Sequence, residues 1–255
     1  MLPKELSPPS DEFKGKPWGL WATFGFSAII FVLLAALQFA VMIAFVSFAK
    51  AEHPELDLEA YAKSLPSNGF WVAMATIVAG LICIPLTIFF ARLRRNISLK
   101  DYIGFREPSK SEWVRWLLIL VALLFLSDMT SFLLHQPIVP PFMEEAYRTA
   151  FFLPALLFAI IIVAPIFEEI FVRGFLFQGI RYSRLGSIGA IGITSSFWAV
   201  IHLQYDAYGM ATIFVLGLLF GIARLKTDSI HLVMVMHSLG SFVATVETIL
   251  YVHFT

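Results

Sequence analysis

Long apolar segments separated by polar connections are the feature that most restricts the fold of this chain. A helix needs about 20 apolar residues to cross the hydrocarbon core of a bilayer. Runs of this kind predict seven helices, over residues 18–48, 70–91, 114–134, 151–180, 187–203, 209–224 and 229–252. Only 14% of the residues are charged, whereas soluble domains average about 25%. We therefore expect an all-α fold, a polytopic transmembrane helix bundle.

The chain divides into three predicted parts. Residues 1–17 form a polar tail, residues 18–149 hold the first transmembrane helices with their loops, and residues 150–255 form a C-terminal helix bundle. The apolar run after the tail is too long for the core of a signal peptide, which predicts a retained first transmembrane helix. No internal repeat is visible, so an inverted-repeat transporter has no support. A net charge of zero without a basic block indicates no nucleic-acid partner.

Lysine and arginine residues are distributed unevenly between the two predicted sides of the membrane. Cytoplasmic loops of membrane proteins carry the excess of these residues. The side that includes the N-terminus holds most of them, whereas the other side holds only Lys50, Lys63 and Arg148. This asymmetry predicts an N-terminus in the cytoplasm and a C-terminus outside.

The stretch APIFEEIFVRGF, Ala164–Phe175, places two adjacent glutamates and an arginine in an apolar helix. A charged side chain at this depth costs roughly 3 kcal/mol or more and usually faces a protein interior. Because side chains four residues apart share a helix face, Glu169 and Arg173 are predicted to form an ion pair. Glu168 lies roughly 100° around the helix from Glu169 and is left available as a general base or acid. Pro165 is expected to kink or loosen this helix. A purely structural ion pair leaves Glu168 without a role.

Two histidines lie in later apolar helices. Trp198 and His202 share a helix face at a spacing of four, as do His237 and Ser241. A lone histidine in such a helix is usually a packing residue, but two of them and an available glutamate on three helices indicate a site. Bringing these side chains to one depth requires the hairpin of residues 187–224 to turn back before it reaches the outer surface.

Three motifs in this region carry a resemblance to a known family. EEIFVR matches a Glu-Glu-x-x-x-Arg motif, WAVIH an aromatic-x-x-x-His motif, and HSLGS is similar to His-x-x-x-Asn. In this order they resemble the CAAX protease and bacteriocin-processing (CPBP, or Abi) family of intramembrane endopeptidases, which includes the Ras-converting CAAX prenyl endopeptidase. The resemblance covers about residues 150–250 and makes residues 150–255 the expected catalytic bundle. Trp198 stands where Phe is usual, and Ser241 stands where Asn is usual.

The resemblance implies a peptide hydrolase with its active site in a membrane cavity. Glu168 and His202 would activate a water molecule, and His237, helped by Ser241, would stabilise the oxyanion. Supporting roles would fall to Glu169, Arg173 and Trp198. We expect the cavity to open toward the cytoplasmic half. The implied partners are the lipid bilayer, taken as the bacterial inner membrane, and a peptide or protein terminus. Processing of a bacteriocin-type peptide and self-immunity against one are both compatible, and a prenylated substrate is not indicated.

Zinc is the open alternative for the chemistry. Glu168, His202 and His237 would leave a zinc ion with one open position. The zinc-protease signature His-Glu-x-x-His is absent, and a ligating Glu168 leaves no free carboxylate as the base. We therefore favour a mechanism that requires no cofactor.

Two functions of other classes are compatible with the same residues. A proton-coupled transporter also uses intramembrane glutamate and histidine, but it calls for a polar chain across the whole membrane, and in the outer half only Asp206 is noted. A non-catalytic membrane scaffold would use the motifs for packing alone, and its biological activity would survive Glu168→Gln.

Overall fold

The computed structural model describes residues 15–254, so the predicted tail of residues 1–17 lies outside the described part except for its last residues. The described chain is helical throughout, with short connections, which confirms the predicted all-α fold. Its elements are α1 (Leu20–Glu52), α2 (Leu58–Ser64), η2 (Leu65–Ser67), α3 (Gly69–Arg92), α4 (Leu99–Ile103), α5 (Lys110–Leu133), α6 (Pro141–Arg148), α7 (Leu153–Phe158), η3 (Ala159–Val163), α8 (Ala164–Glu168), η4 (Glu169–Leu176), α9 (Phe177–Arg181), α10 (Gly186–Val200), α11 (Ala207–Thr227) and α12 (Ile230–Phe254).

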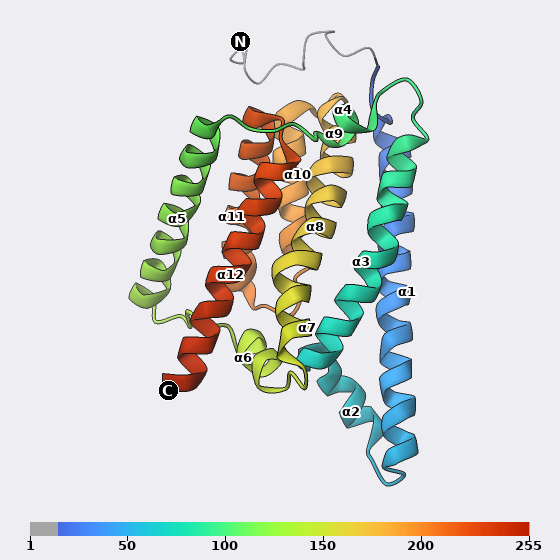
Figure 1. Ribbon diagram of the computed structural model, residues 1–255, viewed down its shortest axis with the longest axis vertical. Helices are drawn as coiled ribbons and strands as arrows, with labels where there is room; N and C mark the ends of the chain where they lie inside the picture. Colours follow the sequence, from blue (N-terminus) through green and yellow to red (C-terminus); the bar gives the residue numbers. More distant parts are fainter. Residues whose placement is uncertain (1–14, 255) are drawn as a thin grey trace.

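Six helical stretches of the described chain are long and apolar enough to cross a membrane. They are α1, α3, α5, the combined stretch Leu153–Arg181, α11 and α12. The seventh predicted span corresponds to α10, which has only 15 residues and therefore a length of about 22 Å. This helix is too short for a full span, and the turn between α10 and α11 comes before the level that α6 and the end of α12 reach (Figure 1). The early turn is the feature that the site required.

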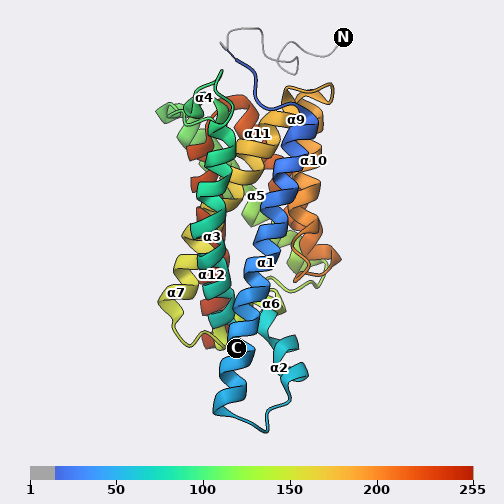
Figure 2. The same cartoon turned by 90° about the vertical axis from the view of Figure 1, so that its right-hand side faces the viewer.

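The two ends of the bundle differ in composition. The basic end holds the connections of residues 92–110, 181–186 and 224–229, and the far end holds residues 134–152. In Figure 1, α1 and α3 lie on one side, α5 stands at the opposite edge, and α8 and α12 lie between them. Figure 2 shows α1 beside α3, with α2 projecting at the far end.

The central stretch Leu153–Arg181 changes its helical geometry twice. Both η3 and η4 are π-helical, and α8 separates them. Pro165, in the first turn of α8, has no N–H to donate to the preceding turn, and the wider π turns of η3 come directly before it. This confirms that the helix is loosened here. Such π segments are frequent at functional sites, and η4 begins at Glu169.

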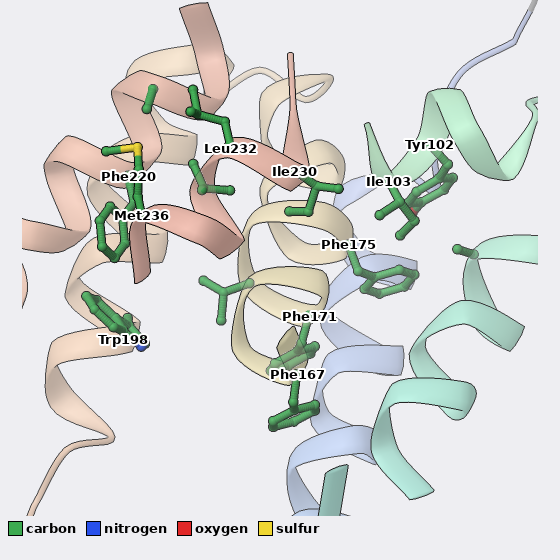
Figure 3. Close-up of a cluster of buried hydrophobic side chains, with 14 of the residues drawn as sticks. Tyr102, Ile103, Phe167, Phe171, Phe175, Trp198, Phe220, Ile230, Leu232 and Met236 are labelled. Carbon is green, nitrogen blue, oxygen red and sulfur yellow. The ribbon is translucent and has the colours of Figure 1, made fainter. Parts of the chain in front are cut away.

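One face of this central helix packs against apolar side chains, and another face carries its charged residues. Phe167, Phe171 and Phe175, spaced by four residues, stack along one face toward Tyr102 and Ile103 (Figure 3). On the other side lie Trp198, Phe220 and Met236, from α10, α11 and α12 (Figure 3). The buried aromatic face fixes the rotation of the helix and thereby turns its two glutamates and its arginine toward α10, α11 and α12.

A fully buried arginine fastens the basic end. Arg224 Nη1 donates to Asp228 Oδ1 at 2.6 Å, Nη2 donates to the carbonyl of Ile103 at 3.1 Å, and Nε donates to the carbonyl of Arg173 at 3.2 Å. These bonds join the end of α11 to α4 and η4. Gly104, with φ of 86°, ends α4 against this guanidinium, and an added Cβ would overlap it. The connection fixes the height of η4 in the bundle.

Candidate active site

Trp198 is the residue around which the predicted site residues gather. Its indole Nε1 donates a hydrogen bond to Glu168 Oε2 at 2.5 Å. Its backbone carbonyl accepts from His202 Nδ1 at 2.6 Å. Its ring lies edge-on to the rings of His202 and His237, with centroids 5.4 and 5.1 Å away. One tryptophan thus contacts three side chains predicted to react, which come from the central helix, the turn after α10 and α12.

A buried charged network lies beside this group. Glu169 Oε1 accepts from Arg173 Nη1 at 3.0 Å and from His237 Nδ1 at 2.9 Å. Glu169 and Arg173 are fully buried, and the predicted ion pair between them is confirmed. The Arg173 guanidinium also lies 4.5 Å from the centroid of the Trp198 ring, a favourable cation–π distance. The prediction did not include His237 as a partner of Glu169.

The hydrogen bonds fix how the two imidazoles face the site. A carbonyl oxygen only accepts hydrogen bonds, so Nδ1 of His202 carries its proton and Nε2 is the basic nitrogen. The ionised Glu169 likewise accepts from Nδ1 of His237. His237 can therefore donate from Nε2 only as an imidazolium, and Glu169 is placed to stabilise that cation.

A cavity of about 460 Å³ adjoins these residues. Trp198, His202, His237 and Ser241 line it, whereas Glu168 is half-buried behind the indole and is not among its lining residues. Further lining comes from α5, α11, the connection of residues 137–143 and the turn of residues 204–206. The cavity therefore extends toward the far end of the bundle. The expected opening toward the half that holds the basic loops is wrong, because α4, η4 and the ends of α11 and α12 fill that end.

The donor geometry does not fit a three-ligand metal centre. Within residues 15–254 no group of three His, Cys, Asp or Glu side chains gathers in a way that could hold a metal ion. The hydrogen bonds of His202 and His237 engage Nδ1 and leave Nε2 for other partners, whereas Glu168 is turned to the Trp198 indole and is not among the cavity-lining residues. We derive no step through zinc.

Three cavity residues were not predicted as site residues. Tyr205, in the turn after α10, lines the cavity, and a tyrosine hydroxyl has an ordinary pKa of about 10. Tyr205 is therefore a protonated hydrogen-bond donor at neutral pH. Asp128 on α5 and Glu247 on α12 also line the cavity. Both lie toward the far end, so the expectation that Asp206 is the only such residue there is wrong. The signal that could have identified Asp128 and Glu247 from the sequence is a carboxylate inside an apolar helix.

The helical bundle, with six stretches long and apolar enough to cross a membrane, defines an integral, multi-pass membrane protein. Residues 150–243 match the family model described as type II CAAX prenyl endopeptidase Rce1-like. The match confirms the resemblance seen in the motifs, and it supports a CAAX-type intramembrane endopeptidase in general. No curated protein and no solved structure matches the chain.

Trp198→Phe is expected to lower kcat for peptide hydrolysis about tenfold, because a hydrogen bond to a charged group is lost while the aromatic ring stays. The matched control is Trp71→Phe, since the buried Nε1 of Trp71 has no partner among the described residues. Steady-state kinetics on reconstituted protein measures both variants. An equal loss in both would contradict a specific role for the indole N–H.

Proposed function

We propose that the chain is an intramembrane endopeptidase that hydrolyses a peptide bond with a water molecule activated by Glu168 and His202. The observation that carries the proposal is the gathering of Glu168, His202 and His237 around Trp198, whose indole, together with the two histidines, lines the cavity. A carboxylate and a basic imidazole nitrogen supply the two proton acceptors that water activation needs. The reaction requires no cofactor.

The proposed step conserves protons and charge. The water oxygen attacks the peptide carbonyl carbon while its proton passes to the Glu168–His202 pair. The tetrahedral intermediate then breaks its C–N bond, and the same proton moves to the departing amine nitrogen. Glu168 thus acts first as base and then as acid, as its position beside the cavity and outside the Glu169–Arg173 ion pair allows.

Stabilisation of the oxyanion falls to His237 and Ser241. Both line the cavity one helical turn apart on α12. The imidazolium of His237 would donate from Nε2, with Glu169 compensating its charge, and the Ser241 hydroxyl can donate one further bond. Such a donor contributes roughly 3 kcal/mol to transition-state stabilisation in other hydrolases. The protonated hydroxyl of Tyr205 is a third donor in the same cavity.

The proposed substrate is a peptide or protein terminus presented from the bilayer, as in maturation of a secreted peptide or self-immunity against a bacteriocin. We place the protein in a bacterial inner membrane with the basic loops and the N-terminus in the cytoplasm, because those loops hold most of the Lys and Arg residues. In this orientation the cavity faces the outer half of the membrane, so the substrate enters from that side.

The proposal is tested with purified protein in lipid vesicles that contain a membrane-extract peptide pool in H₂¹⁸O. We expect new peptide termini, detected by mass spectrometry, with one ¹⁸O in each new carboxyl group because the attacking oxygen comes from water. Vesicles from a mock purification of cells that lack the chain are the control. Identical termini in both preparations would overturn the endopeptidase proposal.

A proton-coupled transporter is the second candidate, favoured by Asp128 and Glu247 in the same cavity as the two histidines. It predicts proton flux across the same vesicles when a pH gradient is imposed, with no new termini. A pH-sensitive dye inside the vesicles measures that flux, so the two functions give opposite pairs of results.

His202→Asn is expected to lower kcat about 10²-fold, within the usual range for losing a general base. The asparagine amide can still donate to the Trp198 carbonyl from the place of Nδ1, but nothing replaces Nε2. His202→Gln, which places its amide nearer to Nε2, should lose the carbonyl bond and also be inactive. If His202→Asn keeps full kcat, the imidazole is only a packing group.

A further inference from the structure

Two acidic side chains of the cavity have no part in the proposed chemistry. Asp128 on α5 and Glu247 on α12 are half-buried, line the cavity from two helices in contact and share a side-chain hydrogen bond. A hydrogen bond between two carboxyl groups needs a proton on one of them. In this arrangement the pair carries at most one negative charge.

None of the ion pairs among residues 15–254 includes Asp128 or Glu247. The other acidic lining residue, Asp206, is engaged differently, since its carboxylate accepts from the backbone N–H of Gly209 at 2.8 Å and begins α11. Ionisable side chains within apolar helices are costly and mark substrate or ion pathways. A cationic group of a bound molecule would supply the opposite charge for this pair.

The other lining residues of the cavity indicate what kind of molecule would carry this cationic group. The cavity lining includes the apolar residues Leu124, Ile138, Phe142, Met143 and Val243, together with hydroxyl groups such as that of Ser131. The pair and the candidate reacting groups share one cavity, so a peptide bound at the reacting groups passes the pair. An apolar segment that carries one positive charge fits this combination of surfaces.

The distance along α12 indicates how far the positive charge of the peptide would lie from the bond that is cut. His237 and Glu247 are ten residues apart on the same helix, which corresponds to about 15 Å. An extended peptide covers this distance in about four to five residues. Because a lysine side chain is itself long, fewer residues between the scissile bond and the lysine are needed. The positive charge would lie about three to five residues from the scissile bond.

We propose that Asp128 and Glu247 form a specificity subsite that selects a lysine or arginine side chain of an otherwise apolar peptide, about three to five residues from the bond that is cut. The subsite rests on the proposed function for its position relative to the scissile bond. Its ability to bind a cationic peptide is independent of hydrolysis. One carboxylate accepts from the cation and the partnered carboxyl holds it in place.

The test uses apolar peptides in which lysine, or its neutral analogue norleucine, occupies each position in turn. Equilibrium binding to the Glu168→Gln protein in vesicles is measured first, and kcat/KM of the unmutated protein second. We expect lysine to be preferred about tenfold or more at one position or two adjacent ones, as a charge-assisted hydrogen bond provides. In Asp128→Asn/Glu247→Gln the ratio of lysine to norleucine should fall to about one. The exposed Glu145→Gln on α6 is the control and should keep the preference.

The outcomes separate this inference from the proposed function. Preferential binding of the lysine peptide without cleavage would support the subsite and contradict the endopeptidase. Cleavage with equal values for lysine and norleucine, or a lysine preference that survives in the double variant, would overturn the subsite. Equal binding of both peptides together with a proton flux that the double variant loses would overturn it as well, and would assign the pair to proton transfer.

Discussion

Glu168→Gln is expected to lower kcat for peptide hydrolysis by at least about 10³-fold while leaving the protein folded. Glu168 is proposed to accept the proton of water and to return it to the amine, and loss of general acid–base catalysis costs up to about 10⁴-fold. The amide oxygen of glutamine can still accept the indole N–H of Trp198, which now bonds to Glu168 Oε2. The packing of the site is therefore retained.

Steady-state kinetics of the reconstituted Glu168→Gln protein measure kcat, and its thermal unfolding midpoint shows whether it is folded. Glu52→Gln is the control, because Glu52 is exposed at the end of α1 and far along the chain from the site. A Glu168→Gln protein that cleaves peptides normally would remove the carboxylate from the mechanism. Biological activity that also survived would favour the scaffold, in which these motifs serve packing alone.

Most of the fold follows from apolar length, because a bilayer imposes nearly the same length on every span. The six long helices lie within a few residues of the predicted ranges. The early turn of the 187–224 hairpin followed from the depths of the site residues rather than from length, and α10 indeed has 15 residues that end in a turn inside the bundle. The short helices of the polar connections, such as α6, lay outside the prediction, because α6 owes its place to packing rather than to hydropathy.

The site was predictable where one helix brings two residues together, and much less so across helices. The Glu169–Arg173 ion pair follows from a spacing of four along the chain. The bond from Glu169 to His237 joins residues 68 apart, and nothing in either segment specifies it. The cavity direction was missed for the same reason, since it depends on which helices pack at the basic end. The reacting roles of Glu168, His202 and His237 stay predictions.

Arg173→Met is expected to destabilise the folded protein by about 3–5 kcal/mol, the usual cost of removing one partner from a buried ion pair. Arg173 and Glu169 have no exposed side-chain surface, so the remaining carboxylate would be ionised, buried and paired only with His237. Methionine keeps much of the volume against Trp198 and Phe220, which limits the cost of lost packing. Reversible unfolding by detergent titration measures the change in the free energy of unfolding.

The double variant Arg173→Met/Glu169→Gln distinguishes charge from shape. Breaking a buried pair leaves an uncompensated charge, whereas removing both partners does not, so the double variant should be more stable than Arg173→Met alone. Glutamine at position 169 can still accept from His237 Nδ1, which keeps that imidazole oriented but takes away the charge that stabilises its imidazolium. The double variant should therefore be folded and have a lowered kcat. Additive losses of stability would show that the two residues act through packing, and full activity in the folded double variant would show that His237 works without the Glu169 charge.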